Sequence, residues 1–138
     1  MSKKAPKPKF ENVLLIDDNE LDNFINQKII ESVNFAKNIY VNTSSTGAME
    51  FLNNLRVLKD KEKELYPQVL FVDINMPIMD GFQFIENLLK TDPQANTRSK
   101  IVILTTSLNP ADKQRAESIT ENIIFLNKPL TESMLEQI

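Results

Sequence analysis

The chain has 138 residues, of which 41% are hydrophobic and 25% charged, and its formal net charge is −3. This composition is that of one ordinary globular domain, and the charge gives no general attraction to nucleic acid or acidic membranes. The sequence contains no cysteine and no histidine, which excludes disulfides, thiolate nucleophiles, imidazole bases and the usual zinc sites. Any chemistry must therefore use carboxylates, hydroxyls, amides, lysine or arginine, and any bound metal should prefer oxygen ligands.

Residues 1–11 are rich in lysine and proline and are predicted to form a flexible basic tail, with a weak docking arm as the alternative. They do not make a signal peptide, because only residues 13–16 follow as an apolar run before Asp17. No apolar run approaches the ~18 residues of a membrane span. A cytoplasmic protein is therefore expected, with one folded domain over residues 12–138.

Five short segments are predicted to be strands of a parallel sheet. Four of them are continuous runs of apolar residues rather than alternating patterns, which is typical of strands buried on both faces. The second in chain order is less apolar and is expected at an edge of the sheet. The predicted strands lie at residues 13–16, 38–41, 69–72, 101–104 and 123–126.

Helical patterns fill the gaps between these strands, with apolar residues at steps of three and four. Asn109 followed by Pro110 is typical of a helix start, and the charged segment 59–64 is expected to be a solvated helix end and loop. The last predicted helix is short. Either the domain has a short final helix, or the sequence stops within a longer one. Helices are predicted within residues 21–33, 49–58, 82–89, from 109 onward and at 130–138. This alternation predicts a doubly wound α/β sheet with right-handed crossovers.

Polar side chains stand where four of the predicted strands end. In a doubly wound sheet the carboxyl ends of the strands meet at one edge, which is where ligands bind. Each residue has a simpler explanation alone, since Asp18 or Asn19 can cap the next helix and a lysine can be an ordinary surface residue. That all of these polar residues lie at the same edge of the sheet favours a functional site. The residues are Asp17, Asp18, Asp73, Thr105 and Lys128.

The charges at this edge indicate which ligands it needs. Two carboxylates about 4 Å apart repel each other by about 4 kcal/mol at an effective dielectric near 20, so Asp17, Asp18 and Asp73 must take up protons or gather cations. With oxygen ligands alone, Mg²⁺ is the natural occupant. Together with the Lys128 ammonium and the Thr105 hydroxyl, such a site can stabilise a phosphoryl group in transit to an aspartate nucleophile.

These residues lie in motifs that resemble the receiver domains of two-component response regulators, the CheY-like proteins. The most specific motif is Asp73-Ile74-Asn75-Met76-Pro77-Ile78-Met79-Asp80-Gly81, which is similar to the family's phospho-acceptor loop throughout. Segments 15–19, 103–107 and 127–130 are similar to the acidic pair, the switch-threonine region and the Lys-Pro corner. The resemblance implies a flavodoxin-like, five-stranded parallel sheet of order 2-1-3-4-5 with helices on both faces.

The resemblance also implies a role for each site residue. Asp73 is the expected phospho-acceptor and a ligand of Mg²⁺. Asp18 would bind Mg²⁺ directly, Asp17 closely or through water, and the backbone carbonyl of Asn75 would complete the protein ligands. Lys128 would pair with the acceptor carboxylate before transfer and with the phosphoryl group after it. The domain would catalyse only its own phosphorylation and dephosphorylation.

Two residues would convert phosphorylation into a signal. Thr105 would hydrogen-bond the phosphoryl group and Phe125, where many relatives have Tyr, would pack inward as the aromatic switch, so that a pre-existing two-state equilibrium shifts. Pro129 would follow a cis peptide bond. The donor would be a phosphohistidine on a histidine kinase or histidine phosphotransfer protein. The output in this phosphorelay would be a protein contact at the fourth helix, fifth strand and fifth helix, without direct contact to nucleic acid or membrane.

Three alternatives stay open at this level. A haloacid-dehalogenase-like phosphatase needs a second aspartate two residues after the nucleophile, where Asn75 stands. A flavodoxin-like cofactor binder needs a Ser/Thr/Gly-rich loop after the first strand, where residues 17–20 would instead repel a phosphate. A degenerate receiver that serves only as an interaction module would have lost a key residue, and all five are present.

Overall fold

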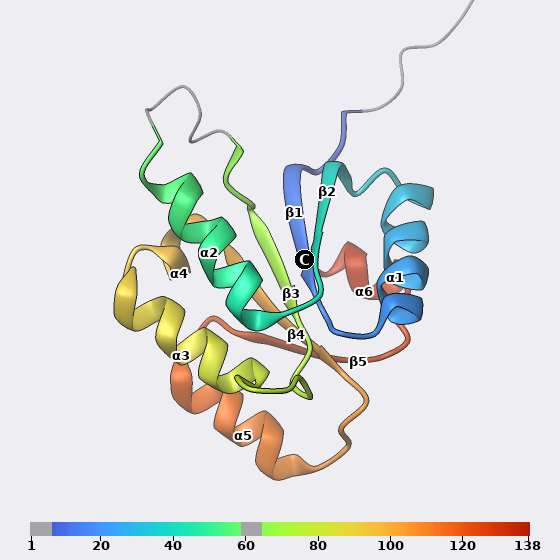
Figure 1. Ribbon diagram of the computed structural model, residues 1–138. Coiled ribbons are helices and arrows are strands. Elements are labelled where there is room, and N and C mark those ends of the chain that lie inside the picture. Colours follow the sequence, from blue (N-terminus) through green and yellow to red (C-terminus); the bar gives the residue numbers. More distant parts are fainter. Residues whose placement is uncertain (1–6, 59–64) are drawn as a thin grey trace, which may run out of the picture.

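A computed structural model describes residues 7–58 and 65–138. The charged segment 59–64 and residues 1–6 of the expected tail lie outside the described residues. Strands and helices alternate along the chain except at one place, where two helices are consecutive (Figure 1). The elements are β1 (Phe10–Ile16), α1 (Glu20–Ser32), β2 (Ala36–Asn42), α2 (Ser45–Arg56), β3 (Val69–Val72), α3 (Gly81–Thr91), α4 (Ala95–Arg98), β4 (Lys100–Thr105), α5 (Pro110–Ile119), β5 (Ile124–Asn127) and α6 (Glu132–Glu136).

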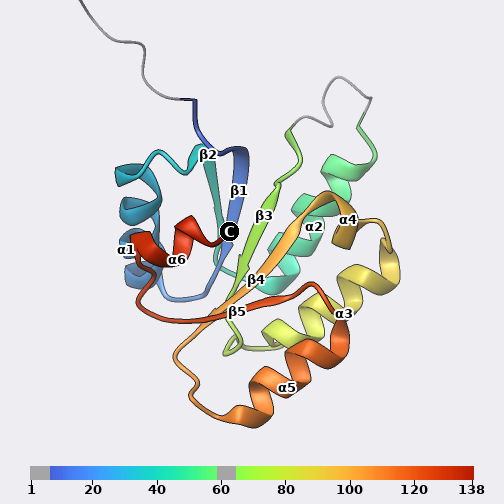
Figure 2. The ribbon, with the colours of Figure 1, turned by 180° about the vertical axis from the view of Figure 1, so that it is seen from behind.

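The five strands form one sheet of order β2-β1-β3-β4-β5 in which every neighbouring pair is parallel. This confirms the predicted strand order and the edge position of the second strand. Figures 1 and 2 show α2, α3 and α5 on one face of the sheet and α1 and α6 on the other. The predicted doubly wound architecture is therefore correct.

Successive side chains of the central strands point to opposite faces, so each strand feeds two cores. In β1, Leu14 and Ile16 pack in the cluster under α2, α3 and α5, whereas Val13 and Leu15 pack in the cluster under α1 and α6. All four side chains are at most 1% exposed, and burying each contributes roughly 1.5–3 kcal/mol. Continuous apolar runs are the sequence pattern that such two-sided burial requires.

The structure extends the predicted first strand and contains one helix that was not predicted. β1 begins at Phe10 rather than at residue 13, because Phe10 pairs in register with Ala36 of β2 and its ring packs on Phe35. Residues 10 and 11 therefore belong to the sheet and not to the tail. The short helix α4, of four residues, was not predicted because one helical turn is too short to show an apolar period.

In five of the described helices, the side chain of the residue before the helix caps its N-terminus. Each capping side chain accepts a hydrogen bond from a backbone N–H of the first turn, which fixes where the preceding loop ends. The Asn109–Pro110 helix start is confirmed. The caps are Asn19, Ser44, Asp80, Asn109 and Thr131.

The last helix, α6, has five residues, and Leu135 together with Ile138 lies buried in the core cluster under α1 and α6. None of the helices in the described ranges combines the length and the hydrophobicity that crossing a membrane requires.

Candidate functional site

Three carboxylates meet at the carboxyl edge of the sheet. Asp17 and Asp18 directly follow β1, and Asp73 follows its parallel neighbour β3. One carboxylate oxygen from each residue lies within 4.8 Å of the others. Asp17 and Asp73 are buried, whereas Asp18 is exposed. The structure thus brings together the three acidic residues that the strand ends predicted.

The loop after β3 holds the backbone of Asp73 in place. The Asp73 N–H donates to the Ile16 carbonyl at 2.9 Å, and the Gly81 N–H donates to the Ile74 carbonyl at 2.8 Å. A Cβ atom at Gly81 would lie 2.3 Å from the Asp73 carbonyl oxygen, so that only glycine fits beside this loop. The Ser45 hydroxyl of α2 also donates to the Met79 carbonyl at 2.7 Å. The Asp73 carboxylate is therefore carried on a fixed backbone.

The environment of Asp73 is short of positive charge. Burial, together with the charge of Asp17, raises the pKa of Asp73 to about 6, although Lys128 acts in the opposite direction. A carboxylate whose ionisation is disfavoured, beside two further carboxylates, is suited to a divalent cation. Three carboxylate oxygens form a donor set that fits Mg²⁺, which prefers oxygen ligands and keeps several waters. Asn75 is exposed in the loop that follows Asp73, and its carbonyl as a further ligand stays a prediction.

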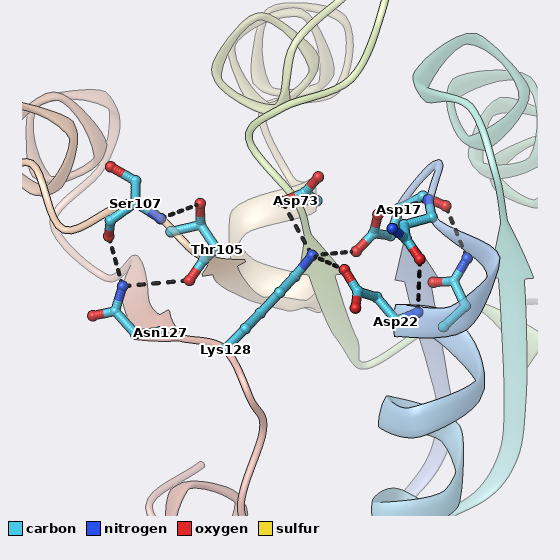
Figure 3. Close-up of polar contacts among 9 residues, drawn as sticks. Asp17, Asp22, Asp73, Thr105, Ser107, Asn127 and Lys128 are labelled. Carbon is cyan, nitrogen blue, oxygen red and sulfur yellow. Dashed lines mark hydrogen bonds and ion pairs between the residues drawn. The ribbon is translucent and has the colours of Figure 1, made fainter.

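Lys128 reaches into this acidic group from the end of β5 (Figure 3). Its Nζ lies 2.6 Å from Asp17 Oδ2, 2.9 Å from Asp22 Oδ2 and 3.4 Å from Asp73 Oδ1. Burial alone would lower the pKa of Lys128, but the hydrogen bonds to Asp17 and Asp22 and the charge of Asp73 outweigh it and raise the pKa above the ordinary value. Lys128 therefore keeps its positive charge. The peptide bond between Lys128 and Pro129 is cis, which confirms the expectation.

Asp22 is a member of the site that the sequence did not single out. It lies in the first turn of α1, where an acidic residue is expected in any case because it interacts favourably with the helix dipole. Its contact with a lysine 106 positions later depends on the side-chain geometry across the site. The available signal was its position five residues after Asp17, at the start of the helix that follows the acidic pair.

Thr105 ends β4 and its side chain is fully buried. Its Oγ1 accepts a hydrogen bond from the Ser107 N–H at 3.1 Å, and its carbonyl accepts from the Lys128 N–H at 2.8 Å. The Asn127 side-chain amide donates to the carbonyls of Ser107 at 2.6 Å and of Thr105 at 3.3 Å. In this state the loop between β4 and α5 is thus tied to β5, as Figure 3 shows. Asn127 was recognised only as part of a motif.

Phe125 lies in the middle of β5 and is half-buried. Its ring packs against the core cluster that α2, α3 and α5 cover. It pairs in register with Ile103, two residues before Thr105. The ring is therefore next to the strand that carries the predicted switch threonine, and its role as a switch stays a prediction.

The sequence matches the family model for the response regulator receiver domain over residues 13–138. With most of the chain covered by that match, and with the acidic group, the lysine and the sheet order in place, the chain belongs to the receiver domains of response regulators, a class of signalling domain.

Solved structures of the same class resemble the chain over almost its whole length. A two-component response regulator from Cytophaga hutchinsonii is 32% identical, with a TM-score of 0.81 over 96% of this chain and 94% of that chain. The chemotaxis response regulator CheY4 of Vibrio cholerae has the same fold at 21% identity, with a TM-score of 0.69 over 93% and 94% of the two chains.

A curated relative is matched only locally. The chain is 44% identical over 34 residues to protein-glutamate methylesterase/protein-glutamine glutaminase 1 of Methanosarcina mazei. The alignment covers 25% of this chain and 10% of that protein, so the chain spans about a tenth of the length of this relative.

Proposed function

We propose that this chain accepts a phosphoryl group on Asp73 from a phosphohistidine of a partner kinase or phosphotransfer protein, in a Mg²⁺-dependent reaction, and signals through a changed protein-interaction surface. The observation that carries this proposal is the position of the buried Asp73 carboxylate. One of its oxygens lies within 4.8 Å of carboxylate oxygens of Asp17 and Asp18, and the carboxylate lies 3.4 Å from the Lys128 ammonium. A nucleophile, a donor set for a hard cation and a fixed positive charge are the parts that phosphoryl transfer to an aspartate requires.

The chemistry follows from the charges. An oxygen of Asp73 attacks the phosphorus, the bond from phosphorus to the donor imidazole breaks with its electron pair leaving on the nitrogen, and an acyl phosphate forms. Lys128 stabilises the negative charge that develops on the phosphoryl oxygens. Mg²⁺ bound by Asp17 and Asp18 would neutralise the same charge. Asn75 stands where a phosphatase of the haloacid-dehalogenase kind would carry its general acid, which favours an acceptor over a hydrolytic enzyme.

Phosphorylation would be transmitted through Thr105 and Phe125. In the state described, the Thr105 Oγ1 accepts a bond from its own loop, and the loop is held by Asn127. A phosphoryl group on Asp73 would offer the Thr105 hydroxyl a stronger, charged acceptor. The loop and the half-buried Phe125 ring would then adopt the second of two states, and the surface of α5, β5 and α6 would bind a target protein.

Apolar side chains around the site support a protein as the phosphoryl donor. On α1, Leu21, Phe24 and Ile25 are 65%, 56% and 44% exposed. Ile78 in the loop after β3 and Leu108 in the loop after β4 are 94% and 85% exposed. Ile78 also has a φ of 71°, a strained backbone for a β-branched residue. A donor that presents phosphohistidine to Asp73 would cover such a rim, which small phosphodonors do not touch.

We expect Phe24→Ala to slow phosphoryl transfer from a histidine phosphotransfer protein by roughly 10-fold, because an exposed aromatic anchor at a docking surface contributes roughly 1–2 kcal/mol. Its rate with acetyl phosphate should stay unchanged. Val57→Ala is the matched control, since Val57 is 77% exposed at the C-terminal end of α2, away from the acidic residues. Equal slowing with both phosphodonors would show that Phe24 acts on the site itself rather than on docking.

The proposed function is tested by incubating the protein with acetyl phosphate and Mg²⁺ and recording the intact mass. We expect a phosphoryl adduct that is lost on standing, as acyl phosphates are, and no adduct when a chelator removes divalent cations. An absent adduct in Mg²⁺ would refute the acceptor assignment, and an equal adduct in chelator would refute the role of the metal. Steady turnover of phosphate esters would instead support a phosphatase.

A further inference from the structure

One carboxylate of the site has no role in the chemistry described so far, and it contacts Lys128. We propose that Asp22 is a positioning residue that competes with Asp73 for the Lys128 ammonium and thereby restrains phosphorylation. The proposal rests on the proposed function of Asp73 as the acceptor. It adds a residue of α1 to a site that otherwise comes from the ends of the strands.

The distances around Lys128 carry the proposal. An ammonium group has three N–H donors and no acceptor, and three carboxylates surround this one. Asp17 at 2.6 Å and Asp22 at 2.9 Å both accept hydrogen bonds from Nζ, whereas the Asp73 oxygen is the most distant, at 3.4 Å. The positive charge is therefore drawn toward Asp17 and toward Asp22 of α1, and away from the acceptor carboxylate.

The backbone of α1 fixes Asp22 in this position. Its N–H donates to the Oδ1 of the capping residue Asn19 at 3.0 Å, so that the first turn is well defined. The Asp22 side chain is 32% exposed, which makes its ion pair stronger than one at an open surface. Interaction with the helix dipole does not require this contact, because Glu20 lies in the same turn and is exposed.

Lys128 and Asp22 both border the same cavity. This cavity, of about 250 Å³, lies on the Asp22 side of the lysine. The residues that line the cavity are Asp22, Ile25, Asn26, Thr106, Lys128 and Pro129. Because Nζ already lies 3.4 Å from Asp73 Oδ1, we expect a small turn of the Lys128 side chain from Asp22 toward Asp73 when a phosphoryl group arrives.

A phosphoryl group makes this competition important. It replaces one negative charge at Asp73 by a dianionic group, and Asp22 adds repulsion while it holds the lysine back. Asp22→Asn keeps the shape of the side chain and removes its charge. We expect the rate of phosphorylation by acetyl phosphate to rise roughly 3- to 10-fold, as removal of one unit charge from a partly exposed site allows.

Three further variants separate this role from a general charge effect. Glu20→Gln removes a negative charge from the same helical turn, and we expect it to change the rate much less than Asp22→Asn. Asp22→Glu restores the carboxylate and should restore a rate close to that of the wild type. In a Lys128→Gln background, Asp22→Asn should lose its effect, because its partner is gone. Equal gains from Glu20→Gln and Asp22→Asn, or a full gain without Lys128, would overturn the proposal.

A spectroscopic measurement keeps the inference separate from the proposed function. The ¹H–¹⁵N signal of the Lys128 ammonium, assigned by its loss in Lys128→Gln, should shift in Asp22→Asn and stay in place in Glu20→Gln. If the wild type forms no adduct, the acceptor assignment fails, while an unshifted Lys128 signal in Asp22→Asn would refute the contact itself. If the adduct forms and Asp22→Asn phosphorylates at the wild-type rate, only the positioning role fails.

Discussion

Asp73→Asn is expected to form no phosphoryl adduct under conditions in which the wild type is fully modified. An amide has nearly the volume of a carboxylate, so the loop between β3 and α3 should keep its hydrogen bonds, but the amide is not a nucleophile toward phosphorus. The expected effect is a complete loss of the added mass. Intact-mass measurement after incubation with acetyl phosphate and Mg²⁺ detects it directly.

Asp80→Asn is the matched control for this experiment. Asp80 lies in the same loop, seven positions after Asp73 in the sequence, and caps α3. Asparagine caps helices about as well as aspartate, so the variant should fold and form the adduct. An undiminished adduct in Asp73→Asn would place the acceptor on another carboxylate of the site, and loss in both variants would indicate damage to the loop rather than loss of the nucleophile.

Asp73→Asn should also stabilise the folded protein when no divalent cation is present. The pKa of Asp73 is raised from 3.8 to about 6 in the folded protein, so the folded state holds the proton more tightly than the unfolded state. As the pH rises from about 4 to above 6, the folded protein must carry a charge that its surroundings disfavour, and wild-type stability falls. Each pKa unit corresponds to about 1.4 kcal/mol, which sets an upper limit of about 3 kcal/mol on the gain from Asp73→Asn at neutral pH.

Urea unfolding in chelator measures this gain. We expect Asp73→Asn to exceed the wild type by roughly 1–3 kcal/mol near pH 7.5, and the difference to shrink toward pH 4, where the wild-type carboxyl is protonated in the folded state. Mg²⁺ should stabilise the wild type more than Asp73→Asn, because the variant lacks one carboxylate of the donor set. A variant less stable than the wild type at pH 7.5 in chelator would show that the charge of Asp73 is well compensated without a metal.

The sequence predicted well those site residues that directly follow a buried apolar strand. The continuous apolar run of β3 predicted a strand buried on both faces, and the doubly wound architecture then predicted that Asp73 at its end lies at the binding edge of the sheet. Parallel pairing of β1 and β3 then brought Asp17 and Asp18 to Asp73. These predictions needed no side-chain geometry, since they follow from strand direction alone.

Other features depend on side-chain positions that no local pattern encodes. By sequence, Asp22 is an acidic residue at the start of a helix and Asn127 is the first residue of the Lys-Pro corner. Each has its partner in an element distant in the sequence. The helix α4 is a single turn without an apolar period. The extension of β1 to Phe10 depends on pairing with β2, which a run of polar residues before Val13 does not predict.

The amide of Asn127 and the ammonium of Lys128 are consecutive along the chain, yet they bind different parts of the site. Asn127 holds the loop between β4 and α5 through the carbonyls of Thr105 and Ser107, and Lys128 holds the acidic group. Two consecutive residues thus join the acidic group to the loop. Under the proposed function, a change at Asp73 would therefore have a short covalent route to this loop, through the peptide unit between Lys128 and Asn127.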